Sequence, residues 1–310
     1  MKPDPWLGSG LPSETGSRPG SGFYRSSLLL LTALLLISAA CVGIEGRIEE
    51  SWPLRINGST TVNPVAAEAA EILRAERKMR INVDTQGGSS GGISGIGEGT
   101  IDVGMSSKPV NDAHRERWPQ AAFVETSIGV DAVALVVSPH VAEAIDALTL
   151  EEVRSIYEGT ITNWSEFGGP NQQIIFFNKE PGRGTWEVFV TWLYGDPDRA
   201  PVVDHPEVGG NEEGRTKVAS TSGAISQLSA SWATATDEIA ALGIELEDGT
   251  IVTSSAESIR TGRYPMARQL FFITNGEPKG DALSFIDFVL SDRGQDLVRK
   301  HGYLGLDDMQ

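Results

Sequence analysis

The sequence predicts an α/β fold in which strands and helices alternate. From Leu54 onward, short apolar runs end in glycine-rich turns, and an amphipathic segment follows most of them. Residues 129–138 read GVDAVALVVS, the kind of valine-rich run that lies buried inside a sheet. No internal repeat is apparent, which excludes solenoid and propeller architectures. The 310 residues therefore suit one large α/β domain or two medium ones, with largely parallel sheets.

The pattern gives the expected elements in chain order. Strands are expected at 54–57, 80–84, 101–104, 129–138, 174–178 and 270–273. Helices are expected at 65–77, 91–97, 112–118, 149–157, 185–193, 222–228, 235–242, 282–290 and 294–300. Pro64 suits a first helical turn, and Thr149 with Glu152 forms a capping-box pattern. The acidic stretch 195–215 is expected to be a loop.

The composition excludes several functional classes. Hydrophobic residues make up 40% of the chain and charged residues 22%, which is typical of a globular protein. The net charge is −17, and no run of five Lys or Arg occurs, so nucleic-acid binding is not expected. A single Cys excludes a disulfide framework and a Cys-rich zinc site, and the four His show no HExxH spacing. We therefore expect no metal and no cofactor.

The first 40 residues have the features of a secretory signal peptide. Residues 28–37 read LLLLTALLLI, basic residues precede them, and small residues lead to Cys41. A membrane-spanning helix needs roughly 20 apolar residues, and this run is shorter. The segment resembles a bacterial lipobox, in which Cys41 would carry the lipid, although Ser38 departs from that pattern. A plain secretory signal and an uncleaved anchor are the alternatives. Residues 41–52 then read as a polar tether.

Three loops rich in Gly, Ser and Thr follow predicted strands, each at or near the start of a helix. Their sequences are NGSTT at 57–61, QGGSSGG at 86–92 and NKEPGRGT at 178–185, with SSK at 106–108 after a fourth strand. The first N–H groups of a helix lack partners within the helix, and the helix dipole is positive there. Glycines let the backbone approach a ligand, and hydroxyls add donors. Together these loops predict an oxyanion site that needs no net positive charge.

The same sequence admits a different reading at Ser89. Residues 87–91, GGSSG, match G-x-S-x-G between a strand and a helix, as a hydrolase nucleophile elbow would. That reading requires an acid and a His later in the chain, and none of the later His lies in a recognisable motif. A secreted serine hydrolase that uses Ser89 therefore remains an alternative. No Walker A motif and no paired-carboxylate motif occurs.

Five stretches, in this order along the chain, match a known family: GSTTVNPVAAEAAE from Gly58, GGSSGGISGIGEGTIDVGMSSKPV from Gly87, EPGRGTWEVF from Glu180, SIRTGRYPMARQLFFIT from Ser258 and FIDFVLSDRGQDLVRKHGYLGL from Phe285. The chain resembles the phosphate-binding lipoproteins that serve the ABC phosphate importer, a branch of the periplasmic solute-binding proteins.

The resemblance implies a type II periplasmic-binding-protein fold, in which two crossing strands join two α/β lobes and the ligand lies in the cleft between them. Lobe one would comprise 53–137 and 268–310, and lobe two 138–267. The implied function is non-enzymatic: the chain would bind inorganic phosphate outside the cytoplasm, as a monomer held to a membrane by its lipid anchor, and deliver it to the permease of an ABC importer.

The resemblance also implies a set of ligand contacts. The family's phosphate contacts fall on Thr60, Thr61, Ser89, Gly184 and Thr185. The predicted site consists of these residues and of their neighbours Ser59, Ser90, Ser107, Lys179 and Arg183.

Four positions depart from the family pattern. This chain has Lys179 where the family has an Arg, and Ser107 where the family has the Asp that pairs with that Arg. It has Arg183 in place of a Ser, and Pro181 in place of a carboxylate that accepts the phosphate proton in some members. Another tetrahedral oxyanion, such as sulfate, tungstate or molybdate, therefore stays an alternative ligand. We hypothesise that Arg183 is the main charged ligand, because its fork donates two hydrogen bonds in one plane.

Overall fold

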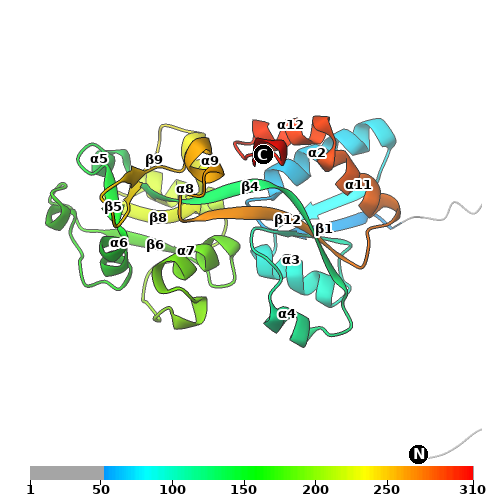
Figure 1. Cartoon of the computed structure of the whole chain (residues 1–310), viewed down its shortest axis with the longest axis horizontal. Coiled ribbons are helices and arrows are strands. Elements are labelled where there is room, and N and C mark those ends of the chain that lie inside the picture. Colours follow the sequence, from blue (N-terminus) through cyan, green and yellow to red (C-terminus); the bar gives the residue numbers. More distant parts are fainter. Residues whose placement is uncertain (1–51, 310) are drawn as a thin grey trace, which may run out of the picture. The chain divides into compact units, whose positions relative to one another are not determined.

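The computed structural model describes residues 52–309, which form one compact unit. The predicted signal peptide, Cys41 and nearly all of the predicted tether lie outside the described residues. Figure 1 shows two groups of helices and strands with β4 and β12 passing from one group to the other. We call the group that contains β1–β3, α2–α4, α11 and α12 lobe one, and the group that contains α5–α10 and β5–β11 lobe two.

The strands belong to two sheets. Their bounds are β1 Leu54–Gly58, β2 Ile81–Asp84, β3 Val103–Ser106, β4 Phe123–Val137, β5 Ala147–Thr149, β6 Ile175–Lys179, β7 Glu207–Val208, β8 Ala224–Ser229, β9 Ala240–Ala241, β10 Gly243–Glu245, β11 Ile251–Val252 and β12 Ala267–Asn275. In the larger sheet the order is β2-β1-β3-β12-β4-β8-β6-β7, and β9 also pairs with β4. The smaller sheet has the order β11-β10-β5.

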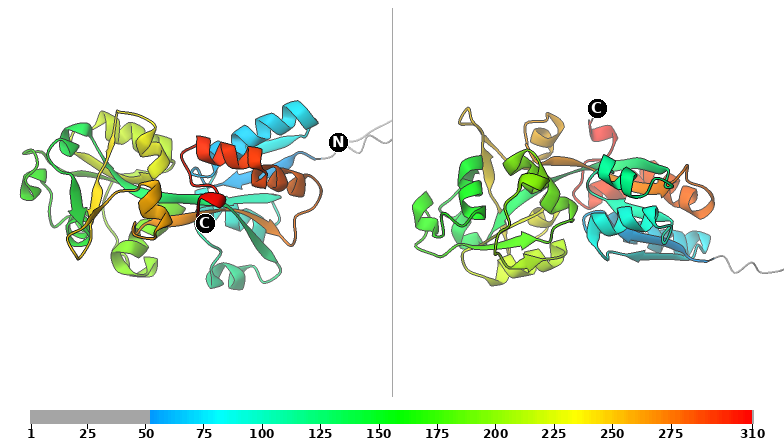
Figure 2. Two further views of the ribbon diagram at one scale, coloured as in Figure 1. Left: turned by 45° about the horizontal axis from the view of Figure 1, so that its top comes forward. Right: turned by 90° about the horizontal axis from the view of Figure 1, so that it is seen from below.

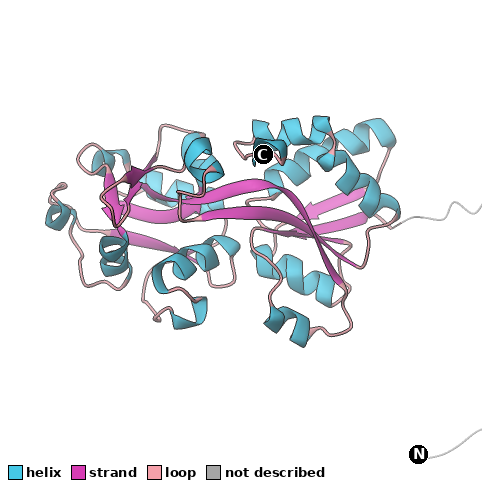
Figure 3. Ribbon diagram, viewed as in Figure 1, coloured by secondary structure: helices cyan, strands magenta, loops and turns pink. Residues whose placement is uncertain are grey.

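The helices surround these sheets, as Figure 3 shows. The α-helices are α2 Asn63–Arg77, α3 Gly88–Gly97, α4 Asp112–Arg117, α5 Pro139–Ala142, α6 Leu150–Tyr157, α7 Gly184–Tyr194, α8 Asn211–Ser220, α9 Ala230–Thr234, α10 Ala256–Arg260, α11 Gly280–Leu290 and α12 Asp292–Lys300. Short 3-10 helices lie at Trp164–Phe167, Pro197–Arg199 and Asp307–Met309.

Strands β4 and β12 join the two lobes. In lobe one β12 pairs antiparallel with β3, and β4 pairs antiparallel with β12 along the whole length of β12. The other end of β4 pairs with β8 of lobe two. Both views in Figure 2 show these strands connecting the two groups of elements. This is the pair of crossing strands that the resemblance implied.

Each lobe has its own hydrophobic core. The core of lobe two contains aromatic side chains, in which Tyr157 packs edge-on against Phe176 and Phe189 at centroid distances of 5.5 and 5.4 Å. The core of lobe one lies between the sheet and helices α2, α11 and α12, and includes Leu73, Phe272 and Phe285. Separate cores give each lobe its own stability, while few chain segments join them.

The structure corrects parts of the sequence-based assignment. The sheets are mixed rather than largely parallel, because β4 and β12 run antiparallel to their neighbours. The helix predicted at 222–228 is wrong, because most of this segment is strand β8, all of whose residues are buried. Its polar side chains are typical of a solvent-facing helix, but Ser226 donates to Phe177 O (2.7 Å) and Gln227 to Asn178 Oδ1 (2.8 Å).

Two further corrections concern lobe two. The helix predicted at 235–242 is wrong: the helical turn is α9, which ends at Thr234, and β9 lies within the predicted range. The loop predicted at 195–215 is also wrong in part, because this stretch contains β7 and the first turns of α8. Gly210 precedes α8 and makes no side-chain cap, so the sequence carries no usual N-cap signal there.

Candidate functional site

The three predicted loops meet at one cavity between the lobes. The cavity is small and is lined by Ser59, Thr60, Thr61, Gly88, Ser89, Ser107, Lys179, Arg183, Gly184, Thr185 and Gly209. Nine of the ten predicted site residues are in this set. The tenth, Ser90, instead donates its hydroxyl to Gly182 O at 2.7 Å, from lobe one to lobe two.

The first loop follows β1 and leads into α2. Gly58 has φ +140°, and a Cβ there would come within 2.1 Å of Met105 O, so only glycine allows β1 to lie this close to β3. The Ser59 hydroxyl accepts from the amides of Thr61 and Val62 at 3.2 and 3.4 Å. These contacts fix the turn that brings the Thr61 side chain to the cavity.

The second and third loops meet face to face. Ser89 lies in the first turn of α3, and its hydroxyl accepts from the amide of Ser107 at 3.1 Å. Gly184 begins α7, and a Cβ there would lie 2.4 Å from Ser107 Oγ and 2.8 Å from Ser89 Oγ. Glycine at 184 therefore lets the positive end of α7, in lobe two, approach lobe one closely.

A buried ion pair that the sequence analysis missed lies behind the cavity. Arg268 of β12 stands opposite Asp131 of β4 in the sheet register, and donates to its carboxylate at 2.8 and 3.0 Å. Both side chains are buried. Burial raises the pKa of the Asp131 carboxyl, and the charge of Arg268 opposes that rise.

Arg268 also donates hydrogen bonds to three hydroxyl oxygens at the cavity. Its guanidinium donates to Thr61 Oγ1 at 3.1 Å, to Thr185 Oγ1 at 3.0 Å and to Ser107 Oγ at 3.3 Å. Thr61 Oγ1 also accepts from Asn211 Nδ2 at 3.0 Å. A hydroxyl has one proton to donate, and Thr61 Oγ1 already accepts two hydrogen bonds, so its proton is available to a ligand.

The two cations that line the cavity are both engaged with other groups. Lys179 is only 1% exposed, and its ammonium donates to the carbonyls of Gly209 and Gly210. The pKa of Lys179 is lowered to about 7, mainly because burial disfavours the charged form and also because Arg183 is near. Arg183 makes a forked contact with the Glu180 carboxylate at 2.6 and 2.9 Å.

The cavity is therefore a donor-rich site without excess charge. Hydroxyls, helix N-termini and two cations surround it, while Glu180 and Asp131 balance Arg183 and Arg268. Such a site suits a small oxyanion. Among the described residues, no group of three His, Cys, Asp or Glu is arranged to hold a metal ion.

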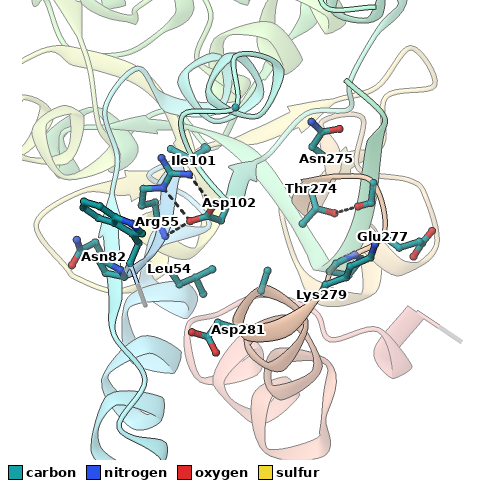
Figure 4. Close-up of a pocket in the computed structure, with 16 residues that line it drawn as sticks. Leu54, Arg55, Asn82, Ile101, Asp102, Thr274, Asn275, Glu277, Lys279 and Asp281 are labelled. Carbon is teal, nitrogen blue, oxygen red and sulfur yellow. Dashed lines mark hydrogen bonds and ion pairs between the residues drawn. The ribbon is translucent and has the colours of Figure 1, made fainter. Parts of the chain in front are cut away.

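A larger hollow lies elsewhere in lobe one and shares no residue with this cavity. Figure 4 shows it at the amino end of β1, whereas the cavity lies at the carboxyl end of that strand. Its wall includes Arg55, which pairs with Asp102 at 2.9 Å. Asp102, just before β3, thus has a structural role.

The comparisons with known proteins agree with this geometry. A family model described as a PBP superfamily domain matches residues 20–293. The phosphate-binding protein PstS of Borreliella burgdorferi is 30% identical over 260 residues, which are 81% of this chain and 89% of that protein. The chain belongs to the phosphate-binding protein family. This confirms the resemblance that the sequence motifs carried.

Two further relatives of this phosphate-binding protein family are similar over most of the chain. PstS of Bacillus subtilis is 29% identical over 296 residues, which are 91% of this chain and 94% of that protein. An X-ray structure from Clostridium perfringens, assigned as a phosphate ABC transporter substrate-binding protein with bound phosphate, has a TM-score of 0.72 and 28% identity. It covers 82% of this chain and 100% of its own. The two-lobe fold is thus confirmed.

Proposed function

We propose that this chain binds inorganic phosphate in the cavity between its lobes and delivers it to the membrane permease of an ABC importer. The observation that carries the proposal is the convergence of the three loops on one small cavity, lined by hydroxyls, helix starts and two cations. The relatives named above support phosphate as the ligand, because they are phosphate-binding proteins and one of them holds phosphate.

The ligand contacts are part of this proposal. We infer that Thr61, Thr185 and Ser89 donate to the anion, with backbone donors from Thr60 and Gly184. Arg183 and Lys179 add positive charge at one side, and Ser59 and Ser107 hold the loops in place. Ser90 does not line the cavity; its hydrogen bond to Gly182 O links the two lobes beside it.

Titration of the full chain with phosphate by calorimetry tests the ligand. We expect one phosphate per chain, bound more tightly than sulfate, tungstate or molybdate. Tighter binding of one of these anions would make that anion the ligand of the same site. Turnover of an ester substrate that Ser89→Ala abolishes would instead support the hydrolase alternative. The groups that contact the Ser89 hydroxyl are the amide and hydroxyl of Ser107, neither of which is a general base.

We further propose that the chain works outside the cytoplasm as a lipid-anchored monomer. The support is the signal-peptide pattern that ends at Cys41. None of the helices between residues 52 and 309 has both the length and the apolar character that a membrane span needs. Cys41→Ser removes the residue that would carry the lipid, whose several acyl chains together anchor a protein stably. The variant should therefore move from the membrane fraction to the soluble fraction. An unchanged membrane fraction would contradict the lipid anchor.

A further inference from the structure

A partly buried ion pair joins the two lobes beside the cavity without lining it. Lys108 follows β3 in lobe one, and Glu187 lies in the first turn of α7 in lobe two. The Lys108 ammonium donates to the Glu187 carboxylate, and the two side chains are only 5% and 21% exposed. Neither residue is among those that line the cavity.

The position of the pair couples it to the ligand loops. Lys108 is the next residue after Ser107, and Glu187 follows Thr185 by two residues. The loop that carries Lys108 is held rigid, because the Ser106 hydroxyl donates to Lys108 O at 2.6 Å and accepts from the Lys108 amide at 3.2 Å. A movement of α7 away from lobe one would therefore break the ion pair and, at the same time, move Thr185 away from the cavity.

Two other polar contacts across this interface are neutral, and the charged Arg268, which reaches Thr61 and Thr185, is already paired with Asp131. The Ser90 hydroxyl reaches Gly182 O at 2.7 Å, and Asn211 Nδ2 reaches Thr61 Oγ1 at 3.0 Å. Such bonds are readily exchanged for water when the lobes separate. An ion pair behaves differently, because closure takes Lys108 and most of Glu187 out of water, and each charge is then stabilised mainly by the other.

We propose that Lys108 and Glu187 are positioning residues that hold the lobes closed and so determine how slowly the bound anion leaves. The proposal rests on phosphate binding at the cavity. Loss of one partner leaves the other charge buried and unpaired in the closed form, whereas in an open form that charge is hydrated at no cost. Such a change acts mainly on dissociation, as it does for buried charge pairs at protein interfaces.

A double-mutant cycle on the full chain tests this coupling. Lys108→Met, Glu187→Gln and the double variant are compared with the wild type in stopped-flow phosphate binding and release. Each single variant should raise the phosphate dissociation rate by about tenfold or more and change the association rate by less than about threefold. In the double variant, the increase in the phosphate dissociation rate should be smaller than the product of the two single increases, because this variant buries no unpaired charge.

Control measurements separate closure from general destabilisation. Glu76→Gln breaks an exposed pair with Arg293 (2.7 Å) that lies entirely within lobe one, so it should leave the dissociation rate unchanged. The melting temperature without phosphate should be similar in all variants. Unchanged dissociation rates in Lys108→Met and Glu187→Gln, or single effects that simply multiply, would overturn the proposal.

The same variants distinguish this proposal from the proposed function. If the wild type binds no phosphate, the proposed function is wrong, and closure is then measured by energy transfer between dyes placed one on each lobe. Glu187→Gln should shift the distance between the dyes to larger values than in the wild type. Identical distance distributions would overturn the closing role of the pair independently of the ligand.

Discussion

Replacement of Arg268 by lysine keeps a positive charge beside Asp131 but removes the planar fork. In the structure the guanidinium contacts the carboxylate through two nitrogens and at the same time reaches Thr61 and Thr185. A lysine ammonium is a single point of charge on a flexible stem, and it cannot make all of these contacts at once. If it stays with Asp131, the two threonine hydroxyls lose the donor that orients them.

The magnitude follows from those two hydrogen bonds, which measure 3.1 and 3.0 Å. Hydrogen bonds to a charged group are worth about 1.5–3 kcal/mol each, and the two hydroxyls would donate to the anion less well without their orientation, so a partial loss of both donors should weaken phosphate binding by about 1–3 kcal/mol. This corresponds to a roughly 5- to 150-fold higher Kd. The contact with Ser107 is longer, at 3.3 Å, and contributes less.

Calorimetric titration of Arg268→Lys with phosphate measures this effect. Thermal unfolding without phosphate is the matching control, since a retained charge beside Asp131 should leave the fold intact. Arg293→Lys, in an exposed ion pair, is the control substitution and should bind like the wild type. Wild-type affinity in Arg268→Lys would show that the hydroxyls need no orientation by the guanidinium, and the reasoning about the buried pair would fail.

Three further predictions concern the residues that line the cavity. Thr185→Val removes one donor at the start of α7 and should cost about 1–3 kcal/mol of phosphate binding with an unchanged fold; wild-type affinity by calorimetry would refute its placement. Arg183→Ala should weaken binding more than Lys179→Ala, by at least about 1 kcal/mol in titrations under matched salt, and the reverse order would make Lys179 the main charged ligand. Lys179, with its pKa lowered to about 7, should gain a proton when an anion binds between pH 7 and 9, because the anion favours the charged form. Calorimetry in buffers of different ionisation enthalpy should detect this proton uptake, and phosphate affinity should fall as pH rises through that window. The Lys179→Met variant should take up less than half as many protons on binding phosphate.

The parts of the site that the sequence predicts are local. A glycine-rich loop between a strand and a helix is contiguous in the chain, so its residue types reveal both the turn and the donors. This is why the sequence alone identifies the loops around Thr61, Ser89 and Thr185, which the structure places at one cavity. Likewise, the long amphipathic helix α2 and the final helices α11 and α12 lie where the apolar spacing predicts them.

The parts that the sequence analysis missed depend on long-range pairing or on polar buried strands. Arg268 and Asp131 are 137 residues apart and meet only through the register of β4 and β12. A signal does exist, because Asp131 interrupts the apolar run 129–138, and a carboxylate within a buried strand requires a partner. Strand β8 resembles a helix in its local pattern, because the hydrogen bonds that satisfy Ser226 come from a neighbouring strand that local patterns do not reveal.

The charges around the cavity explain how a chain with a net charge of −17 can bind an anion. Arg268 is neutralised by Asp131, Arg183 by Glu180, and burial lowers the tendency of Lys179 to carry its charge at all. The local field is therefore close to balanced, and the attraction comes from groups that are oriented in advance. Arg268 contributes to this even without contact with the anion, because it fixes the direction of the hydroxyl protons at Thr61 and Thr185. Since those donors are fixed before the ligand arrives, binding does not have to meet the cost of ordering them.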